Sequence, residues 1–171
     1  FNLAKLLVSK GYKNVKVYSA GMPAWKKAGY QTTKREISQK TPLIKKELVF
    51  KNSIAIGADE GSVDGEWFKS NIGKLPKNVQ IVDVRPKSDF EMGHIDGVIN
   101  IYSESMKIDE FYKLLPKDKT LVFSCATGGR ALEAWMRLNN SKLDSSKIYY
   151  FDANINCKGS ECKIEANEPL D

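Results

Sequence analysis

Apolar runs alternate with helical periodicities along most of the chain. Continuous apolar stretches at 79–84, 98–101 and 120–124 predict strands that are covered on both faces. Helical spacing is found between these runs and around them, at 64–72, 87–92, 108–115 and from 130 to about 138. Strands that alternate with helices predict an α/β fold with a central, mostly parallel sheet.

The first part of the chain repeats a pattern found near its end. The segment 13–21 resembles the segment 146–154, and each follows a stretch with helical spacing. This predicts that residues 1–35 are the C-terminal remnant of a first domain and that 36–48 is a linker. Residues 49–171 then form a complete second domain with a cysteine-bracketed C-terminal segment. A remnant of that size cannot bury its own apolar face, so we expect it to contact the missing first domain, the second unit or a neighbouring chain.

One cysteine stands at a strand end, which is where parallel sheets bind ligands. The predicted strand Thr120–Ser124 ends at Cys125, followed by the glycine pair Gly128 and Gly129 and then by a helix. The glycines let the backbone curl so that several N–H groups point inward, and the helix adds its positive N-terminal pole. These groups favour the thiolate and predict that Cys125 is a nucleophile. The alternative is a buried core cysteine without chemistry.

Three motifs, in one order over about fifty residues, resemble the rhodanese family. They are Ile81-Val-Asp-Val-Arg-Pro-Lys-Ser-Asp-Phe90, then Gly93-His-Ile95 with Gly97-Val-Ile-Asn-Ile101, and finally Leu121-Val-Phe-Ser-Cys-Ala-Thr-Gly-Gly-Arg130. The N-terminal piece is similar to the closing segment of that family, which implies a tandem arrangement. The resemblance implies a three-layer fold whose central, mostly parallel sheet has five strands flanked by helices.

The resemblance also implies an activity. Cys125 would take sulfane sulfur from thiosulfate, a polysulfide or a protein persulfide and pass it to a thiol or cyanide, without a cofactor. The persulfide would be held by Ala126, Thr127, Gly128, Gly129 and Arg130, and Arg130 would orient an anionic donor or hold the rim of the loop. The alternatives are a non-catalytic sulfur carrier or partner-binding module. A phosphatase or arsenate reductase is disfavoured because related phosphatases carry one residue more between cysteine and arginine than the four found here.

Three residues outside the loop match the family's motifs in supporting roles. We expect Asp83 to hydrogen-bond nearby backbone at the end of the sheet. We expect Arg85 to form a structural ion pair with Asp89 rather than to touch substrate. His94, the single histidine, is expected to form a structural hydrogen bond.

The end of the chain departs from the family's pattern. In place of a closing Gly-Gly-x-x-x-Trp helix, a small hairpin or loop is bracketed by Cys157 and Cys162. We predict a disulfide between them, with a metal site or two free thiols as the alternatives, and no metal because the other soft ligands belong to other motifs. A disulfide favours an oxidising compartment, for which we choose the bacterial periplasm, with the cytoplasm as the alternative. Ala126 and Thr127 are neutral, which favours a donor of lower charge than thiosulfate.

Composition adds limits on partners. The net charge is +6, but the lysines are spread along the chain without an arginine-rich stretch, so we expect no nucleic-acid partner. No apolar run approaches the ~20 residues needed to cross a bilayer, so we expect no membrane insertion. The chain begins at Phe1, and a preceding signal peptide would be missing from it.

Overall fold

The computed structural model describes Lys13, residues 27–29 and residues 47–167. The chain divides into two units, Phe1–Lys46 and Glu47–Asp171, and the elements below belong to the second. Most of the predicted remnant 1–35 and of the linker 36–48 lies outside the described residues. Their assignment, and the contact expected of the remnant, therefore stay predictions.

A parallel sheet forms the centre of the second unit. Its strands lie in the order β4 (Ile99–Asn100), β3 (Val79–Asp83), β5 (Thr120–Ser124) and β6 (Ile148–Tyr150). Each neighbouring pair is parallel. All five residues of β5 are buried, because this strand has a partner on both sides and helices on both faces. The predicted α/β architecture is confirmed.

The predicted number of strands is wrong by one. The sheet has four strands among the described residues, and the place beside β6 is taken by the segment 61–63. Ser62 forms only an isolated parallel bridge with Tyr150, flanked by the hydrogen bonds Tyr150 N–Gly61 O (2.9 Å) and Val63 N–Tyr150 O (3.0 Å). The bridge is preceded by a turn, in which the Ser62 N–H donates to the Asp59 carbonyl. Gly61, within this turn, has a positive φ of 76°. The chain is thus turning where a fifth strand would have to extend.

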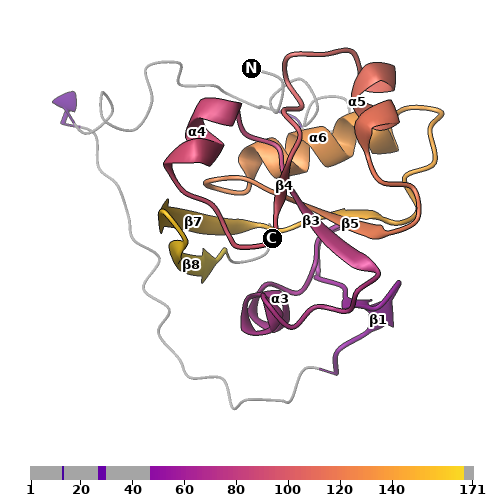
Figure 1. The fold of residues 1–171 in the computed structure, drawn as a ribbon, viewed down its shortest axis with the longest axis horizontal. Helices are drawn as coiled ribbons and strands as arrows, with labels where there is room; N and C mark the ends of the chain where they lie inside the picture. The colour runs from indigo at the N-terminus through magenta and orange to yellow at the C-terminus, as the bar shows by residue number, and fades with distance from the viewer. Residues whose placement is uncertain (1–12, 14–26, 30–46, 168–171) are drawn as a thin grey trace. The chain divides into compact units, whose positions relative to one another are not determined.

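Helices cover the two faces of the sheet. Figure 1 shows α5 (Ile108–Leu114) and α6 (Gly129–Asn139) on one face and α3 (Gly65–Asn71) on the other. Successive residues of a strand point to opposite faces, and the core divides accordingly. Phe123 of β5 packs with Phe111 and Leu138 on the α5–α6 side, whereas Val122 packs with Phe68 on the α3 side. The short helix α4 (Lys87–Met92) follows β3.

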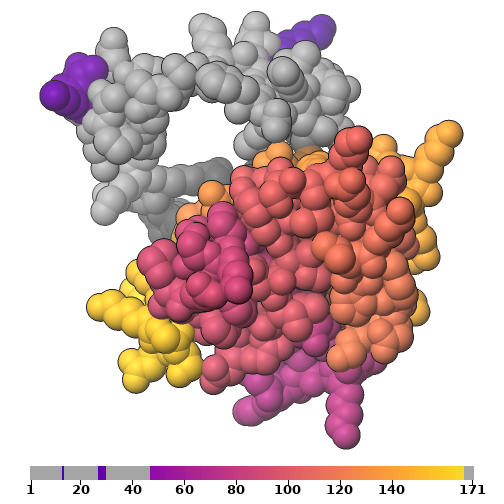
Figure 2. All heavy atoms as spheres, turned by 45° about the horizontal axis from the view of Figure 1, so that its top comes forward, coloured from indigo at the N-terminus to yellow at the C-terminus, as the bar shows by residue number. Residues whose placement is uncertain are grey.

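The C-terminal segment is an antiparallel hairpin, as its cysteine spacing suggested. Strands β7 (Ala153–Lys158) and β8 (Glu161–Ala166) pair along their whole length, and Cys157 lies opposite Cys162. The two cysteines form a disulfide. The tip of the hairpin bridges Gly93, just after α4, through Gly159, and Figure 2 shows the yellow hairpin beside the magenta α4 segment.

A second, shorter hairpin lies at the start of the unit. It consists of β1 (Phe50–Lys51) and β2 (Ile54–Ala55), whose buried residues Ile54 and Ala55 join the core. Within the described part of the chain, no helix has the length and apolar character needed to span a membrane.

Candidate functional site

Cys125 lies at the carboxyl end of β5, at the point where the chain leaves the sheet. It carries a free thiol and is only 3% exposed. The residues 125–130, called here the cysteine loop, lead directly into α6. Gly128 has a φ of 83°, a left-handed conformation that favours glycine, and it is the N-cap of the helix. The sequence placed this turn correctly because a strand, a glycine pair and a helical pattern follow one another without spacer residues.

The cysteine loop supplies the first backbone N–H groups of α6, just after Cys125 in the chain, although none of residues 126–130 lines the hollow described next. No backbone carbonyl among the described residues accepts a hydrogen bond from the N–H groups of residues 126–130. The first N–H groups of a helix have no partner within the helix, and here they adjoin the catalytic candidate. The geometry suits a sulfur anion on Cys125, because the N-terminal pole of a helix favours negative charge.

The space beside Cys125 is very small. It has a volume of about 10 Å³ and is lined by Asp83, Arg85, Ile95, Val98, Ser124, Cys125 and Ile155. A cavity of about this size holds a single water-sized atom. The side chain of Ile155, from the C-terminal hairpin, closes one side of this hollow, which we call the cysteine hollow.

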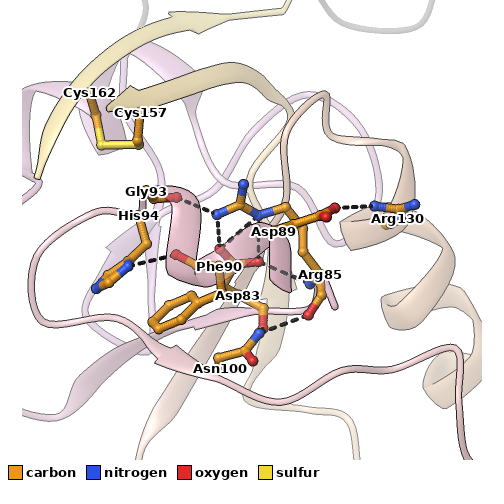
Figure 3. Close-up of polar contacts among 10 residues, drawn as sticks. All are labelled: Asp83, Arg85, Asp89, Phe90, Gly93, His94, Asn100, Arg130, Cys157 and Cys162. Atoms are coloured by element: carbon orange, nitrogen blue, oxygen red, sulfur yellow. Dashed lines mark hydrogen bonds and ion pairs between the residues drawn. A yellow bond between two sulfur atoms is a disulfide. The ribbon is translucent and has the colours of Figure 1, made fainter. Parts of the chain in front are cut away.

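Asp83 and Arg85 form the shortest ion pair near the cysteine hollow. Arg85 Nη2 lies 2.6 Å from Asp83 Oδ2, and the Arg85 backbone N–H donates to Asp83 Oδ1 at 2.9 Å. Arg85 Nη2 also donates to the Gly93 carbonyl at 2.9 Å, as Figure 3 shows. The hydrogen bond to Asp83 raises the pKa of Arg85, and the nearby charges of Asp89 and Cys125 act in the same direction. Arg85 is therefore a fixed positive charge next to Cys125.

The predicted partner of Arg85 is wrong, while the role predicted for Asp83 is confirmed. Arg85 pairs with Asp83, two residues away, because the chain turns sharply after β3 and brings the two side chains together. Asp89 faces Arg130 instead, with Arg130 Nη1 at 3.5 Å from Asp89 Oδ2. Asn100 stabilises the turn by donating to the carbonyls of Asp83 (3.0 Å) and Arg85 (2.8 Å).

Arg130 lies at the rim of the cysteine loop, and two carboxylates compensate its positive charge. Its Nε is 2.9 Å from Glu104 Oε1, in addition to the contact with Asp89. Two carboxylates thus surround the guanidinium that sequence reasoning assigned to an anionic donor. This arrangement weakens the attraction for a dianion at the rim.

His94 has the structural role predicted for it. Its Nδ1 lies 2.9 Å from the Phe90 carbonyl, and its ring stacks on the Phe90 ring with centroids 3.8 Å apart. Figure 3 shows the imidazole turned away from the Asp83–Arg85 pair. It holds the turn that follows α4.

A larger pocket adjoins the cysteine hollow. It has a volume of about 670 Å³, and Arg85 and Ile155 line both spaces. One wall comes from residues around α4 and the cysteine loop, and the other comes from the hairpin. This second space is called here the acceptor pocket, after the role proposed for it below. Its lining residues are Arg85, Asp89, Met92, Gly93, Ala126, Asn154, Ile155, Asn156, Cys157, Lys163 and Glu165. The hairpin residues were not identified from the sequence, because the contact that brings the hairpin to the pocket, between Gly93 and Gly159, joins segments far apart in the chain.

Polar residues at the base of the hairpin hold the cysteine loop. The Ile155 N–H donates to the Ala126 carbonyl at 2.8 Å. Asn167 donates to Asp152 Oδ1 at 2.6 Å and to the Thr127 carbonyl at 3.4 Å. Asp152 Oδ1 would lie 2.0 Å from a Cβ placed on Gly128, so this glycine is required for space as well as for conformation. Sequence reasoning did not identify Asp152 or Asn167, because these contacts join segments far apart in the chain.

The disulfide side of the hairpin faces the acceptor pocket and the core. Cys157 lines the pocket, and both cysteines pack against the apolar cluster on the α3 side of the sheet. A Cβ on the buried Gly93 would lie 3.0 Å from Cys157 Cβ, so the two residues are in close contact. Among the described residues, no group of three or more His, Cys, Asp or Glu side chains could hold a metal ion.

Comparison with known proteins identifies relatives over the same part of the chain. The family model of the Rhodanese-like domain matches residues 64–156. Thiosulfate:glutathione sulfurtransferase of Saccharomyces cerevisiae is 33% identical over 95 residues, which is 49% of this chain and 68% of that protein. Thiosulfate sulfurtransferase GlpE of Shewanella oneidensis is 40% identical over 52 residues, which is 30% of this chain and 50% of that protein. A solved structure of a rhodanese-related protein from Thermoplasma volcanium has 28% identity and a TM-score of 0.41, covering 52% of this chain and 80% of that one.

Proposed function

The chain belongs to the rhodanese-like domain family, and from this premise we propose that it moves sulfane sulfur from a donor to a thiophilic acceptor through a persulfide on Cys125. The Cys125 thiolate attacks the outer sulfur of the donor. The donor's sulfur–sulfur bond breaks, and its electron pair leaves with the remaining part of the donor, as sulfite from thiosulfate or as a shortened polysulfide. An acceptor thiolate or cyanide then attacks the outer sulfur of the persulfide and regenerates the Cys125 thiolate.

One observation supports this reaction above others: the cysteine hollow has room for about one atom. A persulfide adds a single sulfur atom to Cys125, whereas a phosphoryl group adds a phosphorus atom and three oxygens. The small hollow and the four-residue spacing between Cys125 and Arg130 both favour sulfur transfer over phosphate or arsenate chemistry.

The electrostatics of the rim bear on the donor. Arg130 lies between Glu104 and Asp89, and Ala126 and Thr127 bring no charge to the cysteine loop. Arg85 is the remaining guanidinium at the site, and it is paired with Asp83. We therefore propose a donor of lower charge than thiosulfate, such as a polysulfide or a protein persulfide, and a small thiol as the acceptor.

The experiment measures sulfur loading and turnover separately. The chain is incubated with thiosulfate or with inorganic polysulfide, and its intact mass and peptide map are recorded before cyanide is added. We expect a one-sulfur adduct on Cys125, thiocyanate formed faster from polysulfide than from thiosulfate, and neither product with Cys125→Ser.

Other outcomes assign other functions. An adduct on Cys125 without turnover by any acceptor would indicate a sulfur carrier. No adduct with any donor would indicate a partner-binding module. Hydrolysis of an aryl phosphate that disappears in Cys125→Ser, without thiocyanate from the unaltered chain, would overturn the proposal in favour of a phosphatase.

We also propose that the protein works in an oxidising compartment, such as the bacterial periplasm. The disulfide between Cys157 and Cys162 supports this, because such bonds persist mainly outside the reducing cytosol. Cell fractionation, followed by detection of this chain, tests the compartment. Recovery with the cytoplasmic fraction would favour the cytoplasm.

A further inference from the structure

Cys157 lies two positions along β7 from a residue that lines the cysteine hollow. Ile155 lines the cysteine hollow, and Cys157 follows two positions later on the same face of β7. A strand rises ~3.4 Å per residue, so the two Cα atoms are about 7 Å apart. Because the Ile155 N–H binds the Ala126 carbonyl, one edge of β7 is held against the cysteine loop.

Arg85 connects the surroundings of Cys125 with those of Cys157. Its side chain lines both the cysteine hollow and the acceptor pocket, and Cys157 lines the pocket as well. Its guanidinium donates to the Gly93 carbonyl at 2.9 Å, and Gly93 packs against Cys157. In Figure 3 the disulfide and the Arg85 guanidinium lie on either side of Gly93. The Arg85 guanidinium, paired with Asp83, thus lies between the cysteine hollow and the part of the pocket that Cys157 lines.

Strand pairing, in addition to the cross-link, defines the register of the hairpin. Six residue pairs define it, from Ala153–Ala166 to Lys158–Glu161, and Gly159 at its tip is bridged to Gly93. Both cysteines are partly exposed, so external reagents can reach the disulfide. A partly exposed disulfide beside a reactive sulfur is a candidate for exchange chemistry rather than only for stability.

We propose that Cys157 and Cys162 in their reduced form are a built-in dithiol acceptor that unloads the Cys125 persulfide as sulfide. This inference rests on the proposed function. The outer sulfur of the persulfide moves from the hollow past Ile155 into the acceptor pocket. There the Cys157 thiolate attacks it, the bond to Cys125 breaks, and the Cys125 thiolate leaves with the electron pair.

The second step closes the cycle. The Cys162 thiolate attacks Cys157 Sγ, forming the Cys157–Cys162 disulfide and expelling HS⁻. The dithiol loses two electrons, and the sulfane sulfur gains them. An external dithiol protein then reduces the disulfide for another round. Cys157 attacks first because it lines the pocket with Arg85, whereas Cys162 does not.

The test is a single turnover without external acceptor. Anaerobic protein is reduced, freed of reductant and given one equivalent of thiosulfate or polysulfide, and then released sulfide and the peptide map are measured. We expect about one equivalent of sulfide and a new Cys157–Cys162 disulfide. Protein that kept its disulfide, and the Cys157→Ser variant, should both retain the sulfur on Cys125. In Cys162→Ser the sulfur should be trapped on Cys157, a result that loss of folding could not produce.

Two results overturn the inference. One is release of sulfide by Cys157→Ser at the rate of the reduced, unaltered protein. The other is equal release by Cys125→Ser, which would mean that the dithiol reacts with the donor directly. Failure of the proposed function is distinguishable, because Cys125 would then carry no sulfur in any sample.

Discussion

The two walls of the acceptor pocket are built in different ways. The sheet wall, formed by Arg85, Ala126 and residues of α4, follows β3 and β5, where backbone geometry and the Asp83–Arg85 ion pair fix the surroundings of Cys125. The hairpin wall, formed by β7 and β8, is fixed by strand register, a disulfide and a few hydrogen bonds to the cysteine loop. The position of Cys125 depends on the first wall, whereas the shape of the pocket depends on both. The comparison separates what positions the cysteine from what closes the space beside it.

The largest loss of stability is expected when the Asp83–Arg85 ion pair is broken. Arg85→Ala leaves the Asp83 carboxylate, in a residue only 4% exposed, without its charged partner. Removing one partner of a buried pair should lower the free energy of unfolding by about 3 kcal/mol, measured by urea denaturation. Arg130→Ala is the control, because that side chain is 42% exposed and its loss should cost less than about 1 kcal/mol. Equal losses would contradict a buried role for Arg85.

The next largest loss of stability is expected from a substitution in the cysteine loop. Gly128→Ala forces a side chain into a left-handed conformation and against Asp152, so we expect a loss of about 2 kcal/mol and slower loading of Cys125. Gly129→Ala is the matched control, because a Cβ there meets nothing within 4 Å and alanine favours the helix. Stability comes from denaturation and loading from intact mass. If the two variants behaved alike, the special conformation of Gly128 would not matter.

Removal of the disulfide should affect the hairpin wall alone. Replacing Cys157 and Cys162 together by serine lowers the free energy of unfolding by about 2 kcal/mol in the chain-entropy account of so short a loop. Hydrogen exchange should speed up at the amides of β7 and β8 and stay unchanged in β5. An equal loss of protection in β5 would show that the two walls open as one unit.

The smallest effect concerns charge at the rim. Glu104→Gln removes one of the two carboxylates that compensate Arg130, and the KM for thiosulfate should fall by about two- to fivefold. Turnover with polysulfide should change less, and added salt should reduce the difference. An unchanged KM would mean that thiosulfate does not approach Arg130.

Prediction from sequence succeeded where local pattern and local structure coincide. The buried strands β3 and β5, the helix after the glycine pair and the position of Cys125 all follow from short stretches of sequence. Prediction failed where distant segments meet. The partner of Arg85 depends on the turn after β3, and the fifth strand position is filled by the bend at Gly61. The pocket-lining role of the hairpin needs the contact of Gly159 with Gly93, which no local pattern encodes.

The short outer strands of this fold bear on its tendency to aggregate. An open sheet edge is a template on which another chain can add a strand. Strand β4 offers only two residues, and β6 is partly covered by the bridge at Ser62. The longer strand β8 alternates partly buried positions with the exposed charges Glu161, Lys163 and Glu165. Charges on such a strand oppose pairing with a second copy of the chain. Strand β8, which helps to close the pocket, therefore also disfavours fibre-like association.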